Sequence, residues 1–379
     1  MRKIGRLHSS RRILDSSRRI LSFNKTSQHT KNTMSKVRES NLELLRIVAM
    51  FFIVLHHLIA HGMRNVGYLA YPLEEICLDK QIPLILLNAF TVVAVNCYVL
   101  ISGYFGINPT WKKLWNLFAI CAFYSVGHYL VYALLNDTFN IKTFVYSFLP
   151  FSHNQGLWFV TCYIGLFLIS PLLNASVSYL NEKKESEWLK VLGGLAIITF
   201  YFGYLWRTEL NHNGFNLVNF IFLYMIGRYL NIKNTFIQKR LKNYHLFGGY
   251  LVCTFITVSL GIFLLLYKGI ANYMFYWAWR YNSPFVILWS CFLFMFFNSF
   301  TIRKKWINYI ATSTFSVYLI HENLHFNVLI YNYVHEYSSD MNIAILILSL
   351  MMIAIIVFGG CIFIDLIRRL LFDSLTRRN

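Results

Sequence analysis

The sequence predicts an all-α membrane protein, a polytopic helical bundle with about ten transmembrane helices. Hydrophobic residues make up 57% of the 379 residues and charged residues only 13%, which is too apolar for a soluble domain of this length. Apolar stretches of roughly 20 residues, the length that a hydrocarbon core of ~30 Å requires, recur along the chain. No segment alternates with the period of two that a β-barrel strand needs, so a helical bundle is the remaining membrane class.

Ten stretches have the length and the composition expected of membrane-spanning helices. The connections between them are short, so we expect one transmembrane domain over residues 41–367 and no separate soluble catalytic domain. Residues 1–40 are predicted to form a basic, disordered cytoplasmic tail, of which 1–33 are expected to be dispensable, and residues 368–379 a basic cytoplasmic C-terminal tail. The predicted spans are 43–63, 82–102, 114–135, 157–175, 189–206, 215–230, 246–267, 282–300, 307–330 and 341–367.

The net charge of +19 is interpreted as membrane topology rather than nucleic-acid binding. If the N-terminus is cytoplasmic, the segments on the inner side carry 27 of the 35 Lys and Arg residues, and the outer segments carry six. This asymmetry follows the positive-inside rule and predicts that both termini lie in the cytoplasm. The basic excess then favours contact with the anionic inner leaflet of the lipid bilayer, and no nucleic-acid partner is expected. The inner segments are 1–40, 103–113, 176–190, 231–245, 301–306 and 368–379.

The first predicted span contains ionisable residues that a lipid-facing helix would exclude. An ionisable side chain at the centre of a bilayer costs about 3 kcal/mol, so it usually faces the interior of a bundle and often marks a functional site. Arg46 and His57 are eleven residues apart, a spacing that returns to nearly the same helix face after about three turns. We therefore predict one polar stripe along this span, formed by Glu43, Arg46, His57 and His61.

The ninth predicted span carries a second polar stripe. Four of its side chains recur at steps of four, three and four residues, which places them on one face of a continuous helix, with Glu322 beside them. His57 and His321 both lie fourteen residues beyond the start of their spans, or roughly 21 Å along a helix, so we expect them at the same depth. His128, in the third span, is instead expected to pack against a Tyr or a backbone group. The stripe consists of Thr314, Tyr318, His321 and His325.

Four short motifs on these spans resemble those of one family. They are R-x10-H from Arg46 to His57, SGY at the end of the second span, LWF at the start of the fourth and YLIH in the ninth. In this order and on these spans they are similar to the membrane acyltransferase-3 family of ten-span O-acyltransferases, over about residues 40–367. Glu43 stands where the family commonly has an Asp. The other motifs are Ser102-Gly103-Tyr104, Leu157-Trp158-Phe159 and Tyr318 to His321.

The resemblance implies transfer of an acyl group, usually acetyl, from cytoplasmic acyl-CoA to a hydroxyl of a cell-surface glycan. Such a reaction needs a base for the hydroxyl proton and a group that stabilises the oxyanion, and histidine titrates in the useful range. We predict that His57 is the base or a transient acyl carrier, and that His321 orients the acceptor or shares the proton. Glu43 and Arg46 are predicted to form an ion pair or to meet the donor. In the alternative interpretation this pair only holds spans together, and the histidines bond backbone carbonyls.

The donor, acetyl-CoA, is anionic, so its binding residues are expected near the inner surface. Lys112 and Lys113 stand where family members often have an arginine cluster, and the preceding SGY motif (Ser102, Gly103 and Tyr104) permits a close backbone approach. Positive-inside topology explains the two lysines equally well. No metal is expected, because the seven cysteines lack the spacing of a metal site.

The acceptor, a cell-surface or lipid-linked polysaccharide, is not identified by the sequence, and polysaccharide assembly machinery is a candidate partner. The abundance of Asn, Ile, Lys, Phe and Tyr favours a bacterial protein, hence the bacterial cytoplasmic membrane. A transporter or flippase of a lipid-linked glycan would also have about ten spans, but the six prolines are not paired between two halves. A polysaccharide polymerase would favour large, Arg-rich outer loops, and the predicted outer loops are short. Dependence on an acyl-CoA donor distinguishes these classes.

Overall fold

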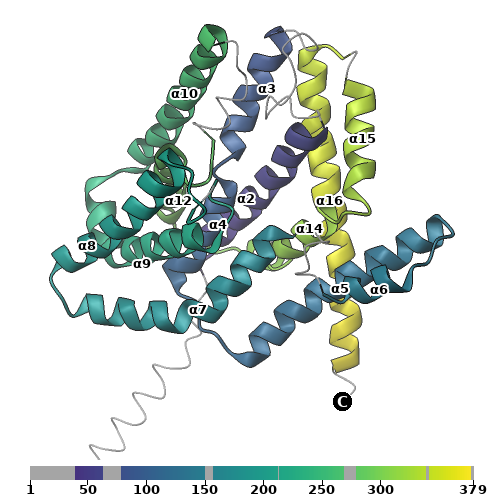
Figure 1. Cartoon of the computed structure of the whole chain (residues 1–379), viewed down its shortest axis with the longest axis horizontal. Coiled ribbons are helices and arrows are strands. Elements are labelled where there is room, and N and C mark those ends of the chain that lie inside the picture. The colour runs from purple at the N-terminus through teal and green to yellow at the C-terminus, as the bar shows by residue number, and fades with distance from the viewer. Residues whose placement is uncertain are drawn as a thin grey trace, which may run out of the picture. The chain divides into compact units, whose positions relative to one another are not determined.

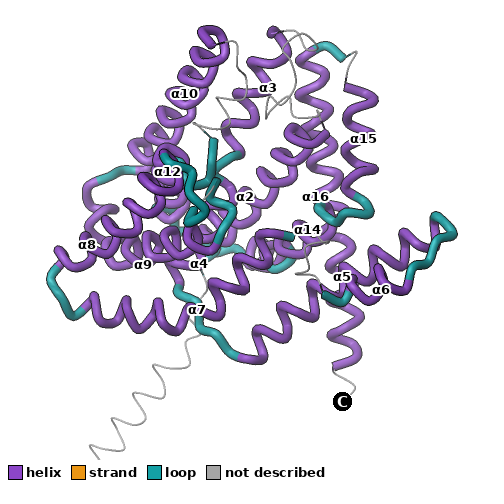
Figure 2. The backbone as a smooth tube through the Cα atoms, viewed as in Figure 1, coloured by secondary structure: helices purple, strands orange, loops and turns teal. Residues whose placement is uncertain are grey.

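The computed structural model describes residues 39–62, 78–149, 157–211, 213–268, 279–338 and 341–376. The chain divides into two units, residues 1–39 and 40–379. Of the first unit only Glu39 is described, so residues 1–38 of the predicted disordered tail lie outside the described residues. The second unit is built from helices, and no strand occurs within the described ranges (Figure 2). The predicted all-α class is thus confirmed for the described residues.

The second unit contains the following helices among its described residues. In chain order they are α2 (Asn41–His57), the π-helical turn η1 (Leu58–Gly62), α3 (Leu78–Thr91), α4 (Ala94–Phe105), α5 (Trp111–Leu135), α6 (Ile141–Ser147), α7 (Trp158–Asn181), α8 (Glu185–Ala196), the π-helix η4 (Ile197–Leu205), α9 (Leu217–Arg240), α10 (Asn243–Lys268), α12 (Pro284–Asn298), α13 (Lys305–Ala311), α14 (Thr314–His321), α15 (Asn327–Ser338) and α16 (Ile343–Thr376).

Helix α2 runs through the middle of the second unit (Figure 1). It contacts α3, α4, α12, α13, α14 and α16. Its start is held by Ser40, whose backbone N–H donates to Ile302 O at 2.7 Å and whose Oγ accepts from Lys304 N at 2.9 Å. The segment before α13 therefore fixes the beginning of α2, and the helix that carries the R-x10-H motif is enclosed by other helices rather than exposed to lipid.

Six helical segments are long and apolar enough to cross a membrane, judged by length and composition over the described residues. They coincide with the predicted spans one to five and ten. The helix α12 is apolar but has only 15 residues. The count of ten spans and the orientation of the termini stay predictions. The six segments are Asn41–Gly62, Ile82–Phe105, Trp111–Leu135, Trp158–Asn181, Glu185–Leu205 and Ile343–Phe372.

The surface of α16 is that of a helix in lipid. Eight of its large apolar side chains are more than half exposed, although soluble proteins rarely expose contiguous apolar patches of such extent. The opposite side of the same helix packs on α14 and α2. Exposed apolar surface together with an apolar bundle interior indicates a membrane protein. The exposed side chains are Ile345, Leu348, Met352, Ile355, Ile356, Phe363, Leu370 and Leu371.

The prediction of one continuous helix over 307–330 is wrong. The segment forms three helices, α13, α14 and α15, with a turn at Thr312–Ser313 and another after Glu322. No Gly or Pro lies in it; the breaks coincide with short polar side chains that bond nearby backbone. Thr312 Oγ1 donates to Tyr309 O at 2.7 Å, and Asn323 Oδ1 accepts from His325 N at 3.1 Å.

Helices α4 and α9 approach closely through a pair of glycines. A Cβ added at Gly103 would collide with the backbone of Tyr224, and one added at Gly227 would lie 2.5 Å from Leu100 O. Gly106 ends α4 with a positive φ of 74°, a backbone conformation that disfavours other residues. Gly103 of the SGY motif thus packs α4 closely on α9, and Gly106 turns the chain at the end of α4.

Candidate active site

Two cavities follow one face of α2, one near each end of the R-x10-H motif. The first, the Arg46 cavity, has a volume of about 330 Å³ and opens near the start of α2. The second, the His57 cavity, has a volume of about 30 Å³ and lies near the end of the helix. Met50 and Ile53, which stand between the two motif residues, line the His57 cavity. Arg46 and His57 therefore face the bundle interior on one stripe, as predicted.

Arg46 and Glu43 form the predicted ion pair. Arg46 Nη1 lies 2.7 Å from Glu43 Oε1 and 2.8 Å from Oε2. The Glu43 side chain is only 4% exposed, whereas that of Arg46 is 24% exposed and borders the cavity. Both residues lie about three to four turns before His57. The pair therefore lies beside the Arg46 cavity and far from the side chain of His57.

The two predicted donor-binding lysines are placed differently. Lys113 lines the Arg46 cavity and its Nζ donates to Asn108 O at 2.8 Å. Lys112 is exposed and is not among the described residues that line the cavity. Arg228 of α9 lies close by, since its Nη1 is 2.8 Å from where a Cβ at Gly106 would stand. The described basic groups at this cavity thus come from three helices, α2, α5 and α9.

The SGY motif contributes to the Arg46 cavity mainly through Ser102. Ser102 lines the cavity, and its Oγ donates to Tyr98 O at 3.1 Å. Gly103 packs against the α9 backbone instead, and the Tyr104 ring packs on Phe294 with centroids 5.3 Å apart. Neither of these two residues is among the cavity's lining residues in the described chain, so their part in donor binding stays a prediction.

Tyr98 stands between the two cavities. Its ring lines the His57 cavity, while its hydroxyl donates to the backbone oxygen of Arg46 at 2.9 Å. Ser102, which lines the Arg46 cavity, lies one turn further along the same helix, α4. A ligand that reaches from one cavity to the other along α2 must therefore pass Tyr98.

Aromatic side chains wall the His57 cavity, and two of the sequence motifs supply them. Trp158 and Phe159 come from the LWF motif and Tyr318 from the YLIH motif. Trp158 also stacks on Tyr281, with ring centroids 5.9 Å apart and an interplanar angle of 21°. Motifs from α2, α7 and α14 therefore meet around one small cavity.

His57 and His321 are in contact, as their matching depth predicted. His57 Nδ1 lies 3.0 Å from His321 Nε2. His321 Nδ1 lies 2.6 Å from Val317 O, and because a carbonyl oxygen only accepts, this nitrogen carries the proton. A neutral His321 then offers a lone pair at Nε2. The contact with His57 therefore requires the proton of His57 to be at Nδ1, and His57 Nε2 is left as the basic nitrogen.

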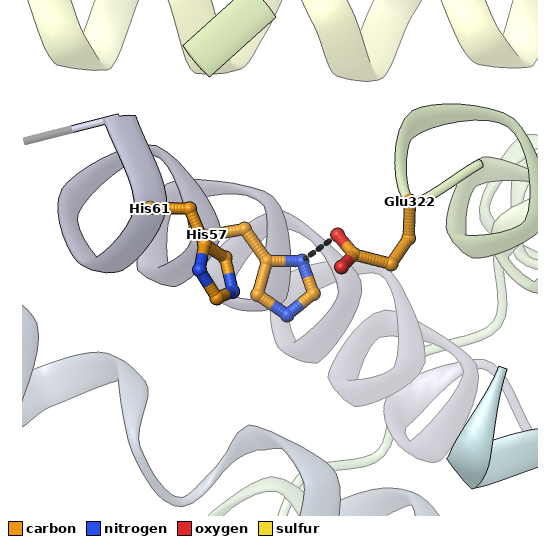
Figure 3. A group of neighbouring side chains, drawn as sticks. All are labelled: His57, His61 and Glu322. Carbon is orange, nitrogen blue, oxygen red and sulfur yellow. Dashed lines mark ion pairs between the residues drawn. The ribbon is translucent and has the colours of Figure 1, made fainter. Parts of the chain in front are cut away.

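Glu322 completes this arrangement, and its role was not predicted from the sequence. Its Oε2 lies 2.9 Å from His57 Nδ1 and accepts a hydrogen bond of 2.7 Å from the Tyr331 hydroxyl. Figure 3 shows the carboxylate facing one nitrogen of the His57 ring, with the other nitrogen turned away. The sequence pattern placed Glu322 next to His321 but did not indicate where its side chain points. Its orientation follows from the end of α14, where Glu322 is the C-cap residue.

Other histidines that the sequence placed near the stripes have separate partners. His325 does not share the face of His321, because α14 ends at His321; its ring stacks on Tyr132 with centroids 4.6 Å apart. His56 points away from His57 and its Nδ1 lies 2.7 Å from Asn88 Oδ1. His128 Nδ1 bonds the backbone oxygen of Tyr124, as predicted.

His61 extends the site by one turn along the first span. It lies on η1, is exposed, and its ring centroid is 5.5 Å from that of His57 and 5.2 Å from that of Tyr331. In Figure 3 the His57 ring stands between His61 and Glu322. One nitrogen or oxygen atom from each of these three residues lies within 4.8 Å of the others, so they are the described residues that could together hold a metal ion.

Comparison with known proteins assigns this arrangement to a family. No curated protein and no solved structure gives a match to the chain. A family model described as an acyltransferase domain matches residues 39–367, a range that contains every motif residue placed above. Because this match covers most of the chain, the protein belongs to the acyltransferase-3 family of membrane acyltransferases.

Proposed function

We propose that the protein is an O-acyltransferase of the bacterial cytoplasmic membrane. It moves an acyl group, in the first instance acetyl, from cytoplasmic acyl-CoA to a hydroxyl of a cell-surface or lipid-linked glycan. The observation that carries the proposal is the state of His57, whose Nδ1 is engaged by Glu322 and His321 while Nε2 is left basic. A histidine held in this way by a carboxylate is a suitable general base for acyl transfer.

The proposed reaction has two stages, and the proton that His57 takes in the first stage is given up in the second. His57 Nε2 takes the proton of the acceptor hydroxyl as its oxygen attacks the thioester carbonyl carbon. The carbon–sulfur bond then breaks, and the imidazolium returns the proton to the CoA thiolate, so that the products are the ester and CoA thiol. The Glu322 carboxylate stabilises the imidazolium between the two stages.

Tyr318 is suited to stabilise the negative charge that develops on the carbonyl oxygen. Its ring lines the His57 cavity, and its buried hydroxyl has no hydrogen-bond acceptor among the described residues. A donor that is already placed where charge develops lowers the barrier without reorganisation. We therefore assign Tyr318 the oxyanion-binding role, with His57 as the base.

The donor is proposed to bind with its phosphates in the Arg46 cavity. Arg46, Lys113 and Arg228 supply positive charge there, and guanidinium groups match phosphate geometry. His57 is eleven residues further along α2, about 16 Å at the rise of an α-helix. The thin pantetheine arm passes Tyr98 and carries the thioester to His57. With both termini in the cytoplasm, the Arg46 cavity lies on the cytoplasmic side.

The His57 cavity must enlarge when substrates bind. Its volume of about 30 Å³ is enough for a water molecule and not for a thioester together with a sugar hydroxyl. The aromatic side chains Trp158 and Tyr281 are part of the wall that has to give way. Aromatic walls that fit closely around the bound thioester keep water from it, which limits hydrolysis.

The test is conversion of labelled acetyl-CoA by membranes that contain the protein. We expect label to appear in an alkali-labile ester on a glycan fraction, and membranes with the His57→Ala variant at matched protein level to lack it. A transporter, flippase or polymerase predicts no dependence on acetyl-CoA. Absence of a labelled ester with wild-type membranes and added glycan acceptor would therefore reject the acetyltransferase function.

A further inference from the structure

We propose that His57, His61 and Glu322 form an inhibitory binding site for a divalent transition-metal ion such as Zn²⁺. The sequence predicts no metal, because its cysteines lack the spacing of a metal site. The fold brings His57 and His61 of the first span to Glu322 at the end of α14, with one ligand atom of each within 4.8 Å of the others. The inhibition, though not the binding, rests on the proposed function of His57.

The spacing of the two histidines favours metal binding. They are four residues apart, at the end of α2 and in η1, and their ring centroids are 5.5 Å apart. Histidines at this spacing on one helix are a recurrent zinc-binding pair, completed by a carboxylate or a third histidine from elsewhere. Glu322 supplies the carboxylate from a different helix (Figure 3).

The groups around these three ligands are those of a metal site. The Tyr331 hydroxyl donates to Glu322 Oε2 at 2.7 Å and so orients the carboxylate, as outer partners of metal ligands commonly do. His321 Nε2 lies 3.0 Å from His57 Nδ1 and is available as a fourth ligand. A tetrahedral zinc with ligand distances of ~2.1 Å separates its ligand atoms by about 3.4 Å, so the present separations need only small side-chain rotations.

The ion can reach the site because His61 is exposed, while the side chains of His57 and Glu322 are 15% and 19% exposed. A neutral imidazole has one lone-pair nitrogen, so when either nitrogen of His57 binds a metal ion the other carries the ring proton, and Nε2 can no longer act as the base. The metal also occupies Glu322, which otherwise stabilises the imidazolium. Metal binding and acyl transfer are therefore mutually exclusive, and metal affinity falls as the histidines are protonated at lower pH.

The first experiment measures binding alone, on purified full-length protein in detergent. Co²⁺ is added as a spectroscopic probe, and Zn²⁺ affinity is obtained by competition with a chromophoric chelator. We expect His61→Ala and Glu322→Gln each to weaken Zn²⁺ binding at least 10-fold, and His245→Ala, which removes an exposed histidine at the start of α10, to leave it unchanged. Equal affinity of wild type and His61→Ala overturns the site.

The second experiment measures inhibition of acetyl transfer by Zn²⁺, each variant being compared with its own rate in the presence of a chelator. We expect wild type and His245→Ala to be inhibited in parallel, and His61→Ala to need at least 10-fold more Zn²⁺. Inhibition of His61→Ala at the wild-type Zn²⁺ concentration contradicts the proposal. Failure of the proposed function would look different, since His61-dependent binding would persist in a protein that transfers no acetyl group.

Discussion

The first and the ninth predicted spans were both expected to be continuous helices with a polar stripe, and only the first of them is continuous. Both carry titratable residues at steps of three and four, and both were assigned a stripe of four polar side chains. The first forms α2 and continues into η1 without interruption. The ninth is broken into α13, α14 and α15. The histidines nevertheless meet, because His321 lies before the second break.

The difference explains how the site obtains its carboxylate. On a continuous helix Glu322 would lie about 100° around the axis from His321, away from the stripe. The end of α14 removes that constraint and lets Glu322 Oε2 face His57 at 2.9 Å, while the Tyr331 hydroxyl of α15 donates to the same oxygen. The intact helix supplies His57, the proposed base, at a fixed depth, and the broken segment supplies its two partners, the consecutive residues His321 and Glu322.

The largest effect is expected for His57→Ala, which removes the base on the intact helix. General bases contribute about 10²- to 10⁴-fold to rate, so we expect acetyl transfer to fall by that factor or to become undetectable, without rescue by more donor. The measurement is ester formed per folded protein in membrane vesicles. His56→Ala is the adjacent control: it is expected to retain turnover, because His56 bonds Asn88 and not the site. Near-normal rates in His57→Ala would remove this residue from the mechanism.

The next largest effect is expected for Glu322→Gln, on the broken segment. The amide preserves the shape but cannot stabilise an imidazolium, so we expect kcat to fall about 10²-fold with little change in the KM for acetyl-CoA. Tyr331→Phe should also lower kcat, but by a smaller factor, since only one hydrogen bond to the carboxylate is lost. Glu322→Asp should restore part of the rate, which a merely structural role in folding would not predict. An unchanged kcat in Glu322→Gln would mean that Glu322, which the break after α14 brings to His57, does not take part in catalysis.

Sequence patterns predicted the positions of the site residues better than their partners. Spacing along α2 was sufficient for Arg46 and His57, because an unbroken helix converts sequence separation directly into direction and depth. The same rule placed His325 on the wrong face and did not predict the contact of Glu322 with His57. The reason is that side-chain hydrogen bonds to the backbone at Thr312 and Asn323 compete with helical hydrogen bonds. Which of these two sets of hydrogen bonds forms depends on tertiary packing, which the spacing of residues along the sequence does not report.

A moderate effect is expected at the Arg46 cavity, near the start of α2. Of the two lysines predicted to bind the donor, only Lys113 is among the residues that line this cavity. Arg46→Ala and Lys113→Ala should raise the KM for acetyl-CoA, because a lost hydrogen bond between charged groups costs about 1.5–3 kcal/mol, or roughly 10- to 150-fold in affinity. Turnover at saturating donor should recover. Lys112→Ala is the matched control, since Lys112 is exposed and outside the lining of the Arg46 cavity. The measurement is a set of donor-concentration curves in membrane vesicles; a donor KM of wild-type value in Arg46→Ala would place the donor elsewhere.

The smallest effect is expected for His325→Ala, and it is the sharpest test of the break in the ninth segment. On a continuous helix His325 and His321 would share a face, and both substitutions would impair the same step. With α14 ending at His321, only His321→Ala should lower turnover at saturating acetyl-CoA, because only His321 contacts His57. His325→Ala should change turnover by less than about 2-fold, and the lost stacking on Tyr132 should appear instead as a modest decrease in thermal stability. Measuring kcat and melting temperature on both variants separates the two outcomes, and an equal loss of turnover would favour the continuous helix.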